Sequence, residues 1–403
     1  TSLDIWAKSA ILINTDTGDI LYEKNADEVI PPASMTKLFS MFIIEEAIKE
    51  GKFSYQTVVP LSSVTWACNM PPHSSLMFLG EGQTVTVEEL LQGLSVCSGN
   101  DAATALAIVI SNENNPMTFS YDDLMNQFVV KMNEMAMQMN LCHTHFVDAS
   151  GYSENNTTTA REMATFIRYY LKNHPQSLER FHSLPSFTYP KEHNLAPGDV
   201  IKNQDWSNGL TKHITMPITQ KNTNPLLGKL PGCDGLKTGY IDESGYNLSL
   251  TVTREGTRML SVTMGGPGNN TAEGQAGRVH DGTELMEWGF SSFSSMYSVG
   301  LGKSYLVKTY GAKEKAVNLI NPRMESTFCV PYIVGENQQE NLSAVKIEIE
   351  VPDYIFGEVV QGQKYGQIKI TLNGYVLDEI PLVADRSIEK SNTFNRFVDY
   401  IIK

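Results

Sequence analysis

The order of strand and helix patterns along residues 1–292 constrains the fold more than any other feature of this sequence. Strand patterns stand at both ends of this stretch, and helical periodicity fills most of the region between them. The expected strands are residues 10–14, 19–23, 236–240, 246–253 and 257–264, and the expected helices are residues 34–50, 86–94, 102–110, 121–139, 159–171 and 272–288. Because strands need partners in a common sheet, this order predicts an α+β fold with one antiparallel sheet flanked by helices.

The C-terminal region has a different pattern. Residues 291–302 are rich in serine and glycine and predict a linker. Strand patterns follow at residues 304–309, 327–334, 344–351, 367–372 and 375–383, and Asn373-Gly374 predicts a type I′ hairpin between the last two. They predict a small all-β sandwich without a cluster of residues typical of catalysis. We therefore expect a catalytic domain at residues 1–292, an all-β domain at 293–388 and a helical tail at 389–403.

Charge and composition exclude several classes of partner. The formal charge is -14 and the pI is near 5.1, so the chain has no overall basic character with which to bind nucleic acid. Five scattered cysteines do not form the spacing of a disulfide framework or of a zinc site, and we expect no metal and no cofactor. No run of about 18 apolar residues predicts a membrane-spanning helix.

Ser34 and Lys37 form the first candidate catalytic pair. Three residues apart at the start of a predicted helix, their side chains leave the same face of its first turn. The lysine can accept the hydroxyl proton if burial or a neighbouring cation lowers its pKa. This spacing occurs by chance roughly once or twice in a chain of this length, and Ser387 with Lys390 is a second match. The pair alone therefore does not identify a nucleophile.

Two further motifs give the pair its meaning. Ser98 and Asn100 lie on a predicted loop between two helices, and Lys237-Thr238-Gly239 lies on a predicted strand. Ser-x-x-Lys, Ser-x-Asn and Lys-Thr-Gly in this order are typical of active-site-serine β-lactamases and penicillin-binding proteins. We predict that Ser34 attacks a carbonyl, that Lys37 is the base, that Ser98 relays a proton to the leaving amine, and that Asn100 holds the lysine or the substrate amide.

The third motif is expected to bind the substrate. Lys237 supplies positive potential that keeps the catalytic lysine neutral and attracts a carboxylate, which Thr238 can bind directly. Gly239 has no side chain, so a peptide can lie close to the strand edge. The backbone N–H groups of Ser34 and Tyr240 are the expected oxyanion hole.

With these motifs the chain resembles the serine-type D-alanyl-D-alanine carboxypeptidases, the low-molecular-mass class C penicillin-binding proteins that carry a C-terminal β domain. The resemblance covers nearly the whole length. Blocks that look like those of the family are residues 32–37, 98–103, 144–146 with Gly151, 234–239, 245–248 and 288–290. Arg278, ten residues before Trp288, stands where the family has an arginine that helps to bind the terminal carboxylate.

The resemblance carries expectations about fold, ligands and location. It implies a β-lactamase/transpeptidase-like domain, no cofactor, and peptidoglycan stem peptides ending in D-Ala-D-Ala as substrates, with β-lactam antibiotics acylating Ser34. It also implies a periplasmic or extracytoplasmic enzyme, peripheral on the outer face of the cytoplasmic membrane. The tail supports this attachment, because Phe394, Phe397, Val398, Ile401 and Ile402 fall on one stripe of an interfacial amphipathic helix. A helix packed on its own domain is the alternative.

Two departures and two alternative functions stay open. Tyr240 stands where relatives often have histidine, and Ser150 where some have histidine, so deacylation or antibiotic turnover can differ. A class A β-lactamase shares the triplet but needs Glu-x-x-x-Asn between the second and third motifs, and no such pattern lies between Asn100 and Lys237. A cell-wall-binding module with little activity would lack a catalytic group, and none is missing here.

Overall fold

The computed structural model describes residues 3–111, 120–207, 209–332 and 338–402. The chain forms two compact units, Thr1–Gly289 and Phe290–Lys403, each with its own hydrophobic core. In the described ranges, no helix is both long enough and apolar enough to cross a membrane.

The first unit is built on a five-stranded antiparallel sheet with the strand order β2-β1-β9-β8-β7. The strands are β1 (Ser9–Asn14), β2 (Ile20–Lys24), β7 (Cys233–Ile241), β8 (Gly245–Arg254) and β9 (Thr257–Gly266). The first strand pairs with β9, so the two ends of this unit meet in one sheet. Glu255 and Gly256 have φ values of +48° and +79°, as a two-residue hairpin turn between β8 and β9 requires. The predicted antiparallel sheet is confirmed, and its order leaves β7 at one edge.

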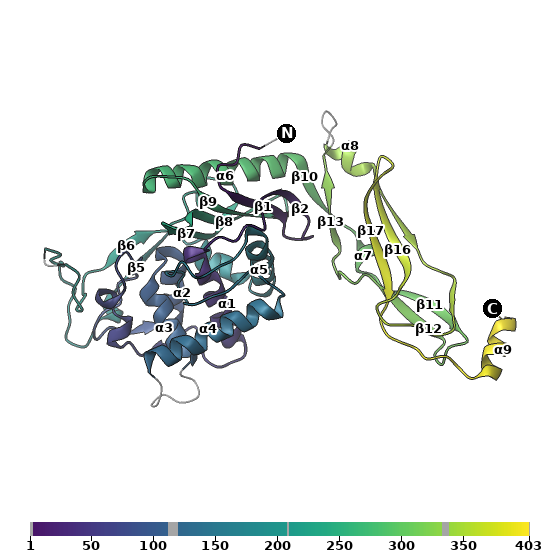
Figure 1. The fold of residues 1–403 in the computed structure, drawn as a ribbon, viewed down its shortest axis with the longest axis horizontal. Helices are drawn as coiled ribbons and strands as arrows, with labels where there is room; N and C mark the ends of the chain where they lie inside the picture. Colours follow the sequence, from purple (N-terminus) through teal and green to yellow (C-terminus); the bar gives the residue numbers. More distant parts are fainter. Residues whose placement is uncertain (1–2, 112–119, 208, 333–337, 403) are drawn as a thin grey trace. The chain divides into compact units, whose positions relative to one another are not determined.

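Helices cover both faces of this sheet, as predicted. In Figure 1, α6 lies along one face, and α1 to α5 gather on the other. Their bounds are α1 (Lys37–Lys49), α2 (Val87–Gln92), α3 (Asn100–Ser111), α4 (Tyr121–Gln138), α5 (Ala160–Asn173) and α6 (Thr271–Ser292). Thr86 caps α2 with a capping box to Glu89, the start signal that its sequence predicts. Phe39 of α1 stacks on Phe166 of α5 with 3.5 Å between ring centroids, so α1 is enclosed by the core.

The region between α5 and β7 contains a hairpin that the sequence patterns miss. Strands β5 (Ser186–Tyr189) and β6 (Ile218–Lys221) pair across a long connection. Four-residue strands this far apart lack both the length and the short turn on which hairpin prediction depends.

The second unit is β-rich, as predicted. Its six-stranded sheet has the order β14-β16-β17-β12-β11-β15, and β10 pairs with β13 in a separate ribbon. The strands are β10 (Phe293–Tyr297), β11 (Tyr305–Tyr310), β12 (Ala316–Ile320), β13 (Thr327–Pro331), β14 (Val345–Glu350), β15 (Tyr354–Phe356), β16 (Lys364–Leu372) and β17 (Tyr375–Ala384). Asn373 and Gly374 have φ values of +49° and +85°, which confirms the type I′ turn. Residues 333 and 334, the end of the strand predicted at 327–334, lie outside the described residues.

The predicted linker at residues 291–302 is wrong. Its first two residues end α6. Residues 293–297 are β10, in which Met296 stands opposite Phe328 of β13, and the last four residues are the short helix α7 (Val299–Gly302). Met296 packs against the core of this unit, with Ser294 and Ser295 beside it in the same strand. Serine-rich composition therefore marks partly exposed strand positions here.

The tail forms the predicted helix, α9 (Thr393–Ile402). Asp399 accepts hydrogen bonds from the Gly311 backbone at 2.8 Å and from Lys315 Nζ at 3.0 Å. Phe397 and Ile401 are 63% and 68% exposed. The helix thus contacts its own unit through a polar side chain while part of its apolar stripe faces outward. The side chains of Phe394 and Ile402, also on the predicted stripe, lie outside the described set.

Candidate active site

Ser34 lies in a tight turn directly before α1. The predicted helix begins here as the 3₁₀ turn η1 (Ala33–Thr36) and becomes α-helical at Lys37. Ala33 has a φ of +48°, a left-handed conformation that costs a residue with a side chain about 1 kcal/mol or more. A strained conformation persists only where the surrounding packing enforces it. Because Ala33 comes immediately before Ser34, the packing that holds Ala33 also fixes the direction of the Ser34 side chain.

Lys37 is fully buried, and three oxygen atoms surround its amine. Nζ lies 2.9 Å from Ser34 Oγ, 2.7 Å from Asn100 Oδ1 and 2.7 Å from the Ser150 carbonyl oxygen. Burial lowers the pKa of Lys37 to about 7, against the opposing effect of the Asp148 and Asp101 carboxylates. A large fraction of Lys37 is therefore neutral near pH 7.

A neutral amine fits these contacts in one way. It has two N–H donors and one lone pair, and the two carbonyl-type oxygens can only accept. The N–H groups therefore point to Asn100 Oδ1 and Ser150 O. The lone pair is left for Ser34 Oγ, whose hydroxyl can donate. This arrangement is that of a general base on a serine nucleophile.

The second motif lies where two irregular elements meet. Ser98 is the left-handed residue, φ +59°, between the π-helical turn η4 (Gly93–Cys97) and α3. Asn100 also donates from Nδ2 to Ser74 Oγ at 3.1 Å, which fixes its amide so that Oδ1 faces Lys37. The buried Asp101 carboxylate accepts three backbone N–H groups from residues 77–79 and so fastens the neighbouring segment to this motif.

The third motif runs along the edge strand β7, against the nucleophile's turn. A Cβ atom at Gly239 would lie 2.5 Å from Pro32 O and 3.1 Å from Ser34 N, so the glycine allows the strand and the turn to touch. Lys237 is fully buried, and burial together with the charges of Lys37 and Arg278 lowers its pKa well below the usual value. Two neighbouring buried amines repel each other's charge, so a double positive charge is disfavoured.

Arg278 and Tyr240 take different positions beside this edge. Arg278, on α6, donates from Nη2 to Gly239 O at 2.6 Å and from Nε to Asn247 O at 3.0 Å. Its guanidinium thus holds the backbones of β7 and β8 together. The sequence predicted only a role in carboxylate binding for this residue. Tyr240 is 45% exposed, and its hydroxyl donates to Asp242 at 2.6 Å. Its ring lies 4.3 Å from that of Tyr246.

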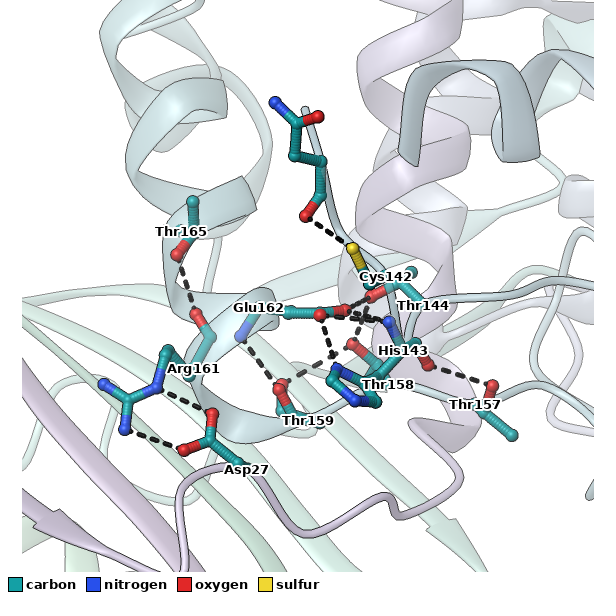
Figure 2. Close-up of polar contacts among 11 residues, drawn as sticks. Asp27, Cys142, His143, Thr144, Thr157, Thr158, Thr159, Arg161, Glu162 and Thr165 are labelled. Carbon is teal, nitrogen blue, oxygen red and sulfur yellow. Dashed lines mark hydrogen bonds and ion pairs between the residues drawn. The ribbon is translucent and has the colours of Figure 1, made fainter. Parts of the chain in front are cut away.

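The loop that carries Ser150 and Gly151 completes the site. Gly151 has a φ of +80°, and a Cβ atom there would lie 1.7 Å from the carbonyl oxygen of Ala33. Figure 2 shows the base of this loop, where the Glu162 carboxylate at the start of α5 accepts from Thr144 Oγ1 at 2.6 Å and from His143 Nδ1 at 2.9 Å. The His143 ring is therefore hydrogen-bonded to a carboxylate. In the described ranges, no group of His, Cys, Asp and Glu side chains is arranged to hold a metal ion.

A cleft opens over the nucleophile between this loop and β7. Its volume is about 810 Å³. It is lined by residues of the nucleophile's turn, of α3, of the Ser150 loop and of β7, including Ser34, Asn100, Gly151, Tyr152 and Tyr240. An extended peptide in this cleft can run beside the edge strand, with its carbonyl next to Ser34.

Sequence comparison identifies the family. The sequence family of D-alanyl-D-alanine carboxypeptidases matches residues 1–268, and that of the C-terminal domain of penicillin-binding protein 5 matches residues 298–390. The chain belongs to the D-alanyl-D-alanine carboxypeptidase family. The resemblance predicted from the three motifs is thereby confirmed.

Individual relatives agree with this assignment. The D-alanyl-D-alanine carboxypeptidase DacF of Bacillus subtilis is 30% identical over 387 residues, which cover 96% of this chain and 86% of DacF. The carboxypeptidase DacA of Escherichia coli is 28% identical, with 98% and 87% covered. The crystal structure of penicillin binding protein 5 from Haemophilus influenzae matches with a TM-score of 0.76 at 27% identity, and the match covers 97% of this chain and 99% of that one. The expected transpeptidase-like fold with a β-rich second domain is thus confirmed.

Two features of this carboxypeptidase site escape sequence reasoning. The contact of Ser150 with Lys37 uses a backbone oxygen, which every residue type supplies, so serine in place of histidine leaves that contact intact. Asp148 accepts hydrogen bonds from five residues of this loop, yet a single aspartate in a loop carries only a weak sequence signal. An aspartate two residues before a serine does favour an Asx turn, and that signal could have drawn attention to it.

Proposed function

We propose that this enzyme removes the terminal D-alanine from peptidoglycan stem peptides ending in D-Ala-D-Ala, through an acyl-enzyme on Ser34. The observation that carries this proposal is the environment of Lys37, whose buried Nζ lies 2.9 Å from Ser34 Oγ and 2.7 Å from each of two oxygens that can only accept, Asn100 Oδ1 and Ser150 O. Membership of the carboxypeptidase family supports the substrate class.

Acylation follows from these contacts. Ser34 Oγ bonds to the carbonyl carbon of the scissile peptide while its proton passes to Lys37 Nζ. The backbone N–H groups of Ser34 and Tyr240 stabilise the negative oxygen that forms. The C–N bond then breaks, and Ser98 transfers a proton to the departing amine of D-alanine, resupplied from Lys37.

Deacylation reverses the order of the same groups. A water molecule gives a proton to Lys37 and attacks the ester carbon, and the bond from that carbon to Ser34 Oγ breaks. The lysine returns the proton to the serine oxygen, and the shortened peptide leaves with a new carboxylate. The neutral amine is thus used twice in one cycle.

The terminal carboxylate of the substrate is expected to bind at Lys237 and Thr238. A carboxylate beside Lys237 favours a proton on that amine, and the resulting charge disfavours a proton on the neighbouring Lys37. Substrate binding and activation of the nucleophile are thereby linked.

β-Lactam antibiotics are proposed to acylate Ser34 in the same way. The related penicillin-binding protein D2 of Listeria monocytogenes has been solved in an ampicillin-bound form; it matches 72% of this chain and all of its own at 25% identity, with a TM-score of 0.55. An acyl-enzyme that water releases slowly makes such a compound an inhibitor, and one released quickly makes the enzyme a β-lactamase.

Release of D-alanine from diacetyl-Lys-D-Ala-D-Ala tests the function. We expect the full chain to release it and Ser34→Ala to lose this activity by about 10³-fold or more, because the nucleophile is gone. Ser387→Ala is the matched control: Ser387 belongs to the other Ser-x-x-Lys match, and its hydroxyl oxygen accepts from the Gln361 backbone. Equal release by Ser34→Ala, or rapid penicillin turnover without peptide cleavage, would overturn the proposal.

We further propose that the enzyme acts at an extracytoplasmic site, peripheral on the outer face of the cytoplasmic membrane, with α9 taking part in its attachment. The exposed Phe397 and Ile401 support this role. Replacing both with serine should weaken co-sedimentation with lipid vesicles about tenfold or more, given about 1.5–3 kcal/mol per buried apolar side chain. Leu306→Ser, at an equally exposed apolar position (73%), is the control. Unchanged sedimentation of the double variant would refute the attachment.

A further inference from the structure

We propose that Asp148 is a positioning residue for this reaction: it shapes the loop so that the Ser150 carbonyl stays on Lys37 and the lysine's lone pair stays directed at Ser34. This inference rests on the proposed acyl-enzyme mechanism and deepens it. It concerns a side chain that lies outside the three motifs and touches none of the reacting atoms.

The Asp148 carboxylate is the centre around which the loop turns. Oδ1 accepts from the Ser150 N–H at 2.7 Å, the Ser150 hydroxyl at 2.9 Å and the Gly151 N–H at 2.7 Å, with the Tyr152 N–H at 3.3 Å. Oδ2 accepts from the Ser153 N–H and from Asn156 Nδ2, each at 2.8 Å. With its backbone N–H groups on both sides held, the Ser150 peptide has little freedom to rotate.

The opposite side of the loop is held by close packing. Because a Cβ atom at Gly151 would meet Ala33 O, the loop backbone already touches the turn that carries the nucleophile. The Ser150 carbonyl therefore sits between two fixed points, Asp148 on one side and Ala33 on the other. Loss of the carboxylate releases one of them.

Orientation of the Lys37 amine depends on this carbonyl. If Ser150 O moves away, the amine keeps two contacts, Asn100 Oδ1 and Ser34 Oγ. The amide oxygen can only accept, so it fixes one N–H group and leaves the other free to turn. The amine can then rotate and place an N–H group, in place of its lone pair, toward Ser34 Oγ. A serine whose hydroxyl accepts from the lysine has no base for its proton, so acylation slows even though every catalytic group is present.

Asp148 also acts on Lys37 through its charge. The charged and titratable groups facing that amine are Asp148 in the loop, Asp101 on α3 and Lys237 on β7. Both carboxylates raise the pKa of Lys37 against the larger effect of burial. Tyr121 of α4 lines a common pocket with Asp148, and burial raises the pKa of its phenol, so it stays uncharged near pH 7. Removing the Asp148 charge should therefore make Lys37 less basic.

Two substitutions separate position from charge. Asp148→Ala removes all the hydrogen bonds and the charge. Asp148→Asn keeps one oxygen, which can still accept from Ser150 and Gly151, but loses the charge and places an NH₂ group near the Ser153 and Asn156 donors. Glu162→Gln is the matched control, because it neutralises a carboxylate that holds the base of the same loop but is not among the charges that shift Lys37.

The measurement is the second-order rate constant for acylation of the full-length enzyme by a fluorescent penicillin, from pH 5 to 9. For the wild type the rate should rise with pH to a plateau with a midpoint near 7, as Lys37 loses its proton. Asp148→Ala should acylate about 30-fold or more slowly at the plateau, as expected for a misplaced base. Asp148→Asn should lower the midpoint by about one pH unit, the usual effect of losing one nearby opposite charge. Glu162→Gln should keep the wild-type midpoint and a rate within about threefold.

Several outcomes would overturn the inference. A wild-type midpoint and plateau in both Asp148 variants would do so, as would an equal shift in Glu162→Gln. Circular dichroism establishes the folded fraction. If Asp148→Ala does not fold, the plateau rate of Asp148→Asn decides, because this variant loses the acceptor for the Ser153 and Asn156 donors, and a wild-type plateau would overturn the inference. A wild type that acylates but releases no D-alanine would refute the proposed substrate and leave this inference standing on the penicillin data.

Discussion

Lys37→Met should acylate at least about 10³-fold more slowly than the wild type with either peptide or penicillin. The substitution removes the base and leaves Ser34, the cleft and β7 in place. Methionine fills most of the volume of the lysine side chain, and Lys37 is fully buried, so the variant should fold. Replacing a buried amine by an apolar group is often neutral for stability. Rate constants for acylation by a fluorescent penicillin, normalised to folded protein, test this expectation.

Lys49→Met is the control for this experiment. Lys49 lies in the last turn of the same helix, and its side chain is 57% exposed. Its acylation rate should stay within about twofold of the wild type, because surface ion pairs contribute little. A Lys37→Met enzyme that acylates within tenfold of the wild type would show that another group takes the serine proton.

Gly151→Ala should slow acylation strongly without altering any catalytic side chain. The new methyl group would lie 1.7 Å from Ala33 O, so the loop and the nucleophile's turn must move apart. A displacement of about 1 Å at such a site costs roughly 10²-fold in rate. We expect a loss of at least that size, together with lower thermal stability, measured by penicillin acylation and by thermal unfolding.

Gly51→Ala separates crowding from backbone strain. Gly51 has a φ of +78°, close to the +80° of Gly151, but nothing lies within 4 Å of a Cβ atom there. Both variants therefore meet the same left-handed penalty of about 1–2 kcal/mol, and one of them also meets a steric clash. Equal acylation by the two variants would show that contact between the loop and the turn does not position the nucleophile.

Prediction of the fold from sequence succeeded where local chemistry decides structure. The β8–β9 turn at Glu255-Gly256 and the turn at Asn373-Gly374 each contain a glycine at positive φ, and Asn373 is a residue type that also adopts positive φ readily. The start of α2 at Thr86 follows from its capping box. The short strands β10, β12 and β15 were missed because three to five residues carry too little periodicity and depend on their partners for stability.

In the candidate site, too, some features follow from local residue chemistry and others from the packing of distant segments. The sequence by itself determined the chemical groups and their order: Ser34 with Lys37, Ser98 with Asn100, and Lys237-Thr238-Gly239, because side-chain chemistry is written directly in residue type. Only the tertiary structure decided the burial that lowers the pKa of Lys37, the lysine's contact with the Ser150 carbonyl and the use of Arg278 to hold β7. Burial and backbone contacts arise when distant segments pack together, and backbone oxygens are the same in every residue, so neither leaves a pattern in the sequence.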